Sequence, residues 1–68
     1  MKLDYKKLKS HFIDSGMTYE QLAEFCEYTT TGMYYIMNGK TKKPGFITIL
    51  NICSALNIDP IELEINND

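Results

Sequence analysis

Hydrogen-bonding side chains are concentrated between residues 29 and 38, where the chain is best equipped for chemistry with a partner. This segment holds three threonines, two tyrosines and an asparagine, and it holds no charged residue. Hydroxyl and amide groups both donate and accept hydrogen bonds. Directly after the segment, Lys40, Lys42 and Lys43 form a cluster of positive charge. The combination favours a ligand that offers polar edges with anionic groups beside them.

Residues that could catalyse a reaction or hold a metal ion are sparse. Cys26 and Cys53 lie far apart in apolar runs, so we interpret both as reduced core residues. The single histidine, His11, has no second histidine or acidic cluster at ligand spacing, and we expect it on a helix surface. The sequence shows no paired carboxylates, no nucleophile with a base and no Gly-rich phosphate loop. We therefore predict no enzyme activity, no metal, no cofactor and no small-molecule ligand, while a purely structural role stays open.

Helical periodicity extends through nearly the whole chain and must position these residues. It predicts helices over about residues 3–14, 30–37 and 46–56, and a capping box that starts at Thr18 predicts another helix between the first two. Thr29 is placed to cap the helix over 30–37 through its hydroxyl. The sequence has no strand-like alternation bounded by hairpin turns, so we predict an all-α fold.

Turn residues and apolar stripes complete the expected path of the chain. Ser15-Gly16 and Asn38-Gly39 are expected to end helices, and Asp59-Pro60-Ile61-Glu62 is a second capping-box pattern that predicts the start of a short fifth helix. The stripes predict a core made of Tyr5, Leu8, Phe12, Leu22, Ala23, Cys26, Met33, Ile36, Met37, Phe46, Ile49, Leu50, Cys53 and Leu56. The other side of the helix over 30–37 should face solvent with Thr30, Thr31, Tyr34, Tyr35 and Asn38.

Length and composition fit one small globular domain. The chain has 68 residues and a mass of 7.9 kDa, and it is 44% hydrophobic and 24% charged. We expect a single domain over residues 1–65 and a frayed tail over 66–68. No stretch is apolar enough for a membrane span or a secretory signal, so we expect no membrane contact and a cytoplasmic location.

The net charge of −2 is unevenly distributed along the chain. Residues 1–58 have a charge of +2, from seven lysines and five acids, whereas residues 59–68 carry −4. The acidic excess therefore belongs to the C-terminal end, and the lysines form two clusters, at 2–9 and at 40–43. Because a charge cluster on a small domain is often only a solvated face, this asymmetry by itself supports an anionic partner weakly.

Two short helices joined by a turn of about three residues, the second with an uncharged polar face and a lysine loop after it, fit a helix-turn-helix. From Met17 to Leu63 the chain resembles the lambda-repressor-like, Cro/CI-type (XRE) helix-turn-helix family, and Asn38-Gly39-Lys40-Thr41-Lys42-Lys43-Pro44 followed by Phe46 is especially similar to lambdoid phage repressors. The segment from Ser54 to Ile58 and the DPIEL motif after it extend the similarity. The resemblance implies a compact five-helix lambda-repressor-like bundle, in which helices two and three form the helix-turn-helix.

The resemblance also implies a function and the residues that perform it. The chain would be a small transcriptional regulator, a phage or prophage repressor or Cro-like protein, that binds an operator in double-stranded DNA and pairs as a homodimer there. Base edges would be contacted by Thr30, Thr31, Tyr34 and Tyr35. Backbone phosphates would be contacted by Thr18, Tyr19, Thr29, Asn38, Lys40, Lys42 and Lys43. Ile58, Ile61 and Ile65 are either the pairing surface or ordinary core and tail residues.

The sequence departs from the family pattern at several positions. Glu27 stands where the family usually has a turn glycine, which predicts a strained or re-routed turn. Tyr19 replaces a frequent glutamine, so one family contact is altered. Phe12 and Met37 replace the buried Arg and Glu pair of some phage repressors with an apolar pair, which avoids the desolvation of buried charge. Arginine is absent, so we expect few guanine contacts.

A different class of function uses the same scaffold. The domain could be a protein-interaction module, such as an anti-repressor or adaptor, with Tyr34, Tyr35 and Phe25 as an aromatic patch. The negative net charge and the absence of arginine favour this alternative, whereas the lysine loop disfavours it. The two functions differ in salt dependence, because phosphate contacts release counterions and protein contacts largely do not.

Overall fold

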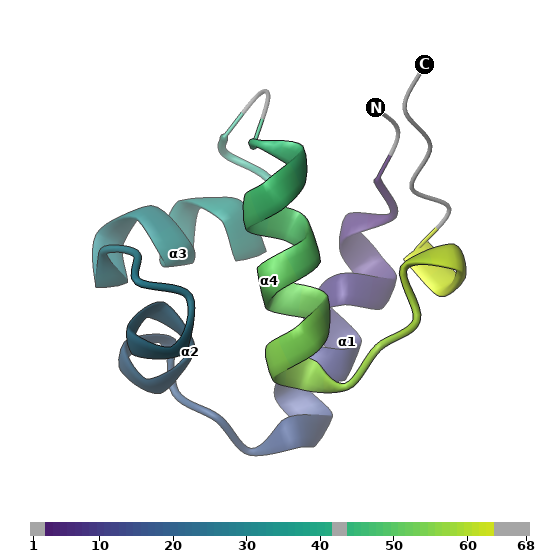
Figure 1. The fold of residues 1–68 in the computed structure, drawn as a ribbon, viewed down its shortest axis with the longest axis horizontal. Helices are drawn as coiled ribbons and strands as arrows, with labels where there is room; N and C mark the ends of the chain where they lie inside the picture. Colours follow the sequence, from purple (N-terminus) through teal and green to yellow (C-terminus); the bar gives the residue numbers. More distant parts are fainter. Residues whose placement is uncertain (1–2, 42–43, 64–68) are drawn as a thin grey trace.

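The computed structural model describes residues 3–41 and 44–63. These ranges contain four α-helices and a short 3-10 helix, joined by short loops. Their order is α1 (Tyr5–Ser15), α2 (Tyr19–Phe25), α3 (Thr30–Met37), α4 (Phe46–Leu56) and η1 (Pro60–Leu63). No strand occurs in these ranges, and the predicted all-α fold is confirmed. In Figure 1, α4 runs through the middle of the molecule, with α2 and α3 on one side of it and α1 and η1 on the other.

Three helices begin where a side chain satisfies a free backbone N–H. Asp4, Thr18 and Thr29 precede α1, α2 and α3, and each accepts a hydrogen bond from the N–H three residues further along, at 3.0–3.1 Å. The capping box of α2 is complete, because the Gln21 side chain accepts a bond from the Thr18 N–H at 3.0 Å. α1 begins at Tyr5 rather than at residue 3, since the backbone of Asp4 is extended.

Residues in the left-handed conformation end α1 and α3 where the sequence predicted. Gly16 follows α1 with φ of 74°, and Gly39 follows α3 with φ of 68°. Glycine adopts this conformation without the steric penalty that a Cβ brings. The short loops that result bring successive helices back onto one core.

The core lies where all five elements meet. Its buried apolar residues are Leu8, Phe12, Leu22, Ala23, Cys26, Met33, Ile36, Met37, Ile49, Ile52, Cys53, Ile58 and Leu63. No polar or charged side chain is buried among the described residues. Both cysteines are free and buried, as predicted, so they pack as small apolar residues.

The predicted buried face of α4 is partly wrong. Ile52 is fully buried although the sequence analysis left it out, whereas Phe46 is 36% exposed and Leu50 and Leu56 are only half-buried. The reason is that α4 is apolar on most sides, so its periodicity does not fix which side packs inward. Tyr5 is also half-buried rather than a core residue.

The predicted fifth helix is a single 3-10 turn in the described residues. Asp59 still caps it, because its carboxylate accepts a hydrogen bond from the Ile61 N–H at 3.0 Å, but the Glu62 carboxylate points toward His11 of α1. Leu63 is fully buried, and its carbonyl accepts a bond from the Asp4 N–H at 3.0 Å. The turn therefore closes against the start of α1. The predicted frayed tail over 66–68 lies outside the described residues.

None of the helices described has the length and apolar character that a membrane crossing requires.

Candidate nucleic-acid interface

The turn between α2 and α3 sets the angle at which the candidate site is presented. The Tyr28 N–H donates to the Ala23 carbonyl at 2.8 Å, and the Glu27 N–H donates to the Glu24 carbonyl at 3.2 Å, which is the bonding pattern of a Schellman motif. Glu27 occupies the left-handed position of this motif, with φ of 53°. The chain therefore follows the tight turn with a strained glutamate instead of re-routing it.

The exposed side of α3 is uncharged and polar, as the sequence predicted. Met33, Ile36 and Met37 are buried, and the opposite side carries Thr30 and Thr31 together with two tyrosines. Tyr34 is 41% exposed and Tyr35 is 46% exposed, so neither is packed inside the bundle. Hydroxyl and aromatic groups on this side are available to a partner.

A row of aromatic rings connects this exposed side to the core. Phe12 of α1 packs on Tyr19 with ring centroids 4.8 Å apart, Tyr19 meets Tyr34 edge-on at 5.4 Å, and Tyr34 lies 6.0 Å from Tyr35. These separations lie in the range where aromatic pairs attract. Because the row begins on a buried ring, the two tyrosines of α3 are supported from inside the protein.

Asn38 fixes the C-terminal end of α3. Its Nδ2 donates to the Tyr34 carbonyl at 2.8 Å and to the Tyr19 hydroxyl at 3.4 Å, and its Oδ1 accepts a hydrogen bond from the Lys9 Nζ. Both ends of the amide are thus engaged within the protein. A phosphate contact by Asn38 stays a prediction, and the structure gives this residue a positioning role in addition.

Positive charge lies at the same end of α3. The Lys40 Nζ is 5.6 Å from the centroid of the Tyr34 ring, within the range of a cation–π interaction. Lys42 and Lys43, the other predicted phosphate-contacting lysines, lie outside the described residues. Lys9 reaches this end from α1, which the sequence analysis missed, because nothing in the order of residues indicates which part of α1 faces α3.

The cap residues Thr18 and Thr29 are exposed and still have hydrogen-bonding capacity. Each hydroxyl oxygen accepts one backbone N–H, which leaves its own O–H free to donate. Both threonines stand at helix N-termini, where the backbone dipoles favour an anion. The phosphate contacts of Thr18 and Thr29 stay predictions.

Comparison with family models shows to which family the chain belongs. A family model described as the Cro/C1-type HTH DNA-binding domain matches residues 7–68. The chain belongs to this family. Neither a curated protein nor a solved structure matches it in the corresponding comparisons. The resemblance of Met17 to Leu63 to the Cro/CI-type family is therefore confirmed, and DNA is the partner that membership implies.

The Cro/C1-type domain keeps its α2–α3 packing despite its departures from the family pattern. Phe12 and Met37 are both buried in the core, so the apolar pair replaces the charged one without an unsatisfied group. Tyr19 is half-buried beneath Tyr34 instead of lying free at the surface. Its ring supports the exposed face, which a glutamine in its place would not do.

Tyr28 is a further residue at this face of the Cro/C1-type domain that the sequence analysis did not single out. Its ring lies against Gly32 of α3, where an added Cβ would stand 2.6 Å from the ring and 2.7 Å from the Thr29 hydroxyl. Tyr28 is 41% exposed, next to the Thr29 cap. The absence of a side chain at Gly32 therefore determines where this ring lies.

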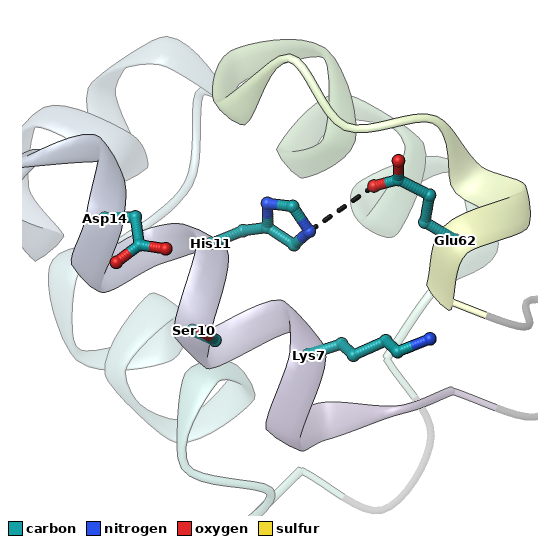
Figure 2. A pocket seen from close by; sticks show the side chains of 5 residues that line it. All are labelled: Lys7, Ser10, His11, Asp14 and Glu62. Carbon is teal, nitrogen blue, oxygen red and sulfur yellow. Dashed lines mark ion pairs between the residues drawn. The ribbon is translucent and has the colours of Figure 1, made fainter.

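A hollow of about 410 Å³ lies beside α1, away from the exposed side of α3, and is lined by side chains of both charges (Figure 2). It is lined by Lys7, Ser10, His11, Asp14 and Glu62. The His11 Nε2 is 3.4 Å from a Glu62 carboxylate oxygen. The described residues of the Cro/C1-type domain include no group of three His, Cys, Asp or Glu side chains able to hold a metal ion. The residues that line this hollow come from α1 and η1, and none of them belongs to the predicted recognition face.

Proposed function

We propose that this Cro/C1-type domain is a sequence-specific transcriptional regulator that places α3 in the major groove of double-stranded DNA. The observation that carries the proposal is the exposed, uncharged, hydrogen-bonding side of α3 with a lysine at its exit. A solvated helix face with no partner would ordinarily carry lysine or glutamate. The repressor or Cro-like role follows from the resemblance of residues 38–44 to lambdoid phage repressors.

Base recognition in this proposal rests on the exposed hydroxyls of α3. The Thr30 and Thr31 hydroxyls exchange hydrogen bonds with base edges, and their methyl groups contact thymine methyls. The Tyr34 and Tyr35 hydroxyls act further along the same groove. Because arginine is absent, bidentate guanine contacts are few and the preferred operator is rich in A·T pairs where α3 lies.

Phosphate contacts in this proposal surround α3. They are made by the cap residues and helix-end residues Thr18, Tyr19, Thr29 and Asn38, and by the loop lysines Lys40, Lys42 and Lys43. Asn38 donates to a phosphate by releasing its 3.4 Å bond to the Tyr19 hydroxyl, because its amide has only two N–H donors. Such contacts fix the register of a protein on the duplex and carry no direct sequence information. Because bases and phosphates are contacted by different residues, two kinds of variant are expected. Variants of base-contacting residues should alter sequence specificity, and variants of phosphate-contacting residues should alter affinity for every sequence.

Pairing on the operator is the second part of the proposal. Two recognition helices that enter successive major grooves are about 34 Å apart, which requires a surface between the copies. Ile58 belongs to the core and is unsuited to pairing, whereas Ile61 on η1 is 80% exposed. Ile65 lies outside the described residues. We assign the pairing contact to Ile61, and Ile61→Glu should abolish cooperative occupation of a two-half-site operator without changing single-site affinity.

The deciding experiment is the selection of bound fragments from a random duplex library. The affinity of the protein is then measured for the most enriched sequence, the selected duplex, and for an unrelated duplex. Tyr35→Ala or Thr31→Ala should weaken the selected site by about 1–3 kcal/mol and leave the unrelated duplex nearly unchanged. Lys40→Met or Lys42→Met should weaken both alike. Equal losses on both duplexes for the α3 variants would refute base recognition.

A protein partner is the competing outcome of the same measurement. Phe25 is 59% exposed, yet it makes none of the aromatic ring contacts found among the described residues, so it does not extend the row of Tyr34 and Tyr35. If no duplex is retained at low ionic strength, the regulator proposal fails and an interaction module becomes the better explanation. A log–log salt slope near −0.9 per phosphate contact supports the regulator.

A further inference from the structure

We propose that α1 provides a phosphate-binding site of its own, in which Lys6 and Lys9 hold a backbone phosphate beside the exit of α3. The inference rests on the proposed DNA binding and adds a helix that the recognition face does not include. A hollow of about 200 Å³ lies between α1 and the end of α3. Its lining consists of Tyr5, Lys6, Lys9, Met37, Asn38 and Gly39.

The lining of this hollow makes it suitable for an anion. It includes two lysines and no carboxylate, whereas the larger hollow on α1 includes Asp14 and Glu62. Lys6 and Lys9 are three residues apart, so they are neighbours on the same side of the helix. Like charges at this spacing destabilise a helix slightly, so the pair gives the fold nothing by itself. A bound anion would turn this repulsion into attraction.

Lys9 is held in place for such a role. Its Nζ donates to the Asn38 Oδ1, and the side chain is partly buried between α1 and α3. An ammonium group has three N–H donors, so two remain for a phosphate after the bond to Asn38. Because the lysine is already ordered, it loses less side-chain freedom on binding than a free surface lysine does.

The hollow is continuous with the proposed DNA-contacting surface. Asn38 bonds both to Lys9 and to the Tyr34 carbonyl, and the Lys40 ammonium lies over the Tyr34 ring. Lys9 and Lys40 therefore flank the same end of α3 from different elements.

The test uses three single variants of one helix: Lys6→Met, Lys9→Met and Lys7→Met. Lys7 is the matched control, because it has the same charge but lines the other hollow with Glu62. Binding is measured on the selected duplex and on an unrelated one over a range of salt concentrations. Each phosphate contact contributes about −0.9 to the slope of log K against log salt.

The expected result is a slope shallower by about 0.9 for Lys6→Met and for Lys9→Met, on both duplexes, and an unchanged slope for Lys7→Met. The same relation makes each of the two variants about eightfold weaker than the unaltered protein at 0.1 M salt and nearly equal to it at 1 M. Lys9→Arg retains the charge and should retain the slope.

Other results separate this site from the function on which it rests. If the unaltered protein binds duplexes but Lys6→Met and Lys9→Met keep its full slope, the α1 site is refuted and DNA binding stands. If Lys9→Met weakens binding to either duplex at an unchanged slope, Lys9 merely positions Asn38, and the site is again refuted. If no duplex binds the unaltered protein at low salt, both proposals fail.

Discussion

Replacing Glu27 with glycine should stabilise the protein, because Glu27 is held with φ of 53° in the turn between α2 and α3. A residue with a Cβ loses roughly 1–2 kcal/mol in the left-handed conformation. Glycine avoids that loss but gives the unfolded chain more freedom, which costs about 0.4–1 kcal/mol. Subtracting the entropy cost from the strain that is relieved predicts that the free energy of unfolding rises by about 0.5–1 kcal/mol. In a domain of this size, that gain raises Tm by about 2–8 °C.

Two further variants isolate the backbone effect from the charge of the side chain. Glu27→Ala removes a carboxylate from the C-terminal end of α2, where the helix dipole disfavours negative charge, but it keeps the strained φ. Any gain from this variant should disappear at high salt, whereas the gain from Glu27→Gly should persist. Asn57 follows α4 with φ of 57°, and Asn57→Gly should gain less because asparagine tolerates this conformation.

The assay is urea unfolding of the three variants at low and high salt, with the midpoint and the slope of each transition compared. A higher midpoint at an unchanged slope is the expected result for Glu27→Gly. If this variant were no more stable than Glu27→Ala at high salt, the conclusion that the turn stores backbone strain would be refuted. Glu27→Gly and Glu27→Ala should bind the selected duplex equally, since both remove the same carboxylate and the turn keeps its shape.

Three other predictions concern stability. Ile52→Ala should destabilise the fold by about 2–5 kcal/mol and Leu50→Ala by clearly less, because only Ile52 is fully buried; equal losses in urea unfolding would contradict the packing of α4. Thr29→Ala should lose about 1 kcal/mol, since the cap bond to the Gly32 N–H is removed, while Thr29→Ser should retain it. Burial raises the pKa of both the Cys26 and the Cys53 thiol, and the Asp59 carboxylate adds to the rise at Cys53. The free energy of unfolding should therefore fall as the pH rises through the ordinary thiol pKa of 9.0. The reason is that the unfolded chain then releases thiol protons that the folded chain keeps. A Cys26→Ala, Cys53→Ala double variant that loses as much stability over the same pH range would contradict that explanation.

The local elements were predictable because their signals lie within a few residues of sequence. Thr18 and Thr29 cap their helices through bonds to an N–H three residues away, and Gly16 and Gly39 end helices through their own φ. The bounds of α3 follow from such signals and agree with the structure, and the bounds of α4, which were predicted from its apolar periodicity, agree as well. Caps and turns of this kind require no knowledge of the rest of the chain.

The side of a helix that packs inward was predictable only where polar residues mark the other side. In α3 the threonines and tyrosines alternate with Met33 and Ile36, so the exposed face could be read directly. In α4 nearly every residue is apolar, and the prediction chose Leu50 where the fold buries Ile52. Packing against α1 and α2 decides between such nearly equivalent faces.

The residue types alone predicted the four α-helices, the neutral face of α3 and the likeness to Cro/C1-type domains, since each depends on neighbours along the chain. Tertiary contacts alone joined Phe12 to Tyr19 and Tyr34, brought Lys9 to Asn38, and laid Tyr28 on Gly32. These contacts depend on the angle at which α1 crosses α3 and on the turn at Glu27. Such angles are set by how the whole core packs, and no short stretch of sequence encodes them.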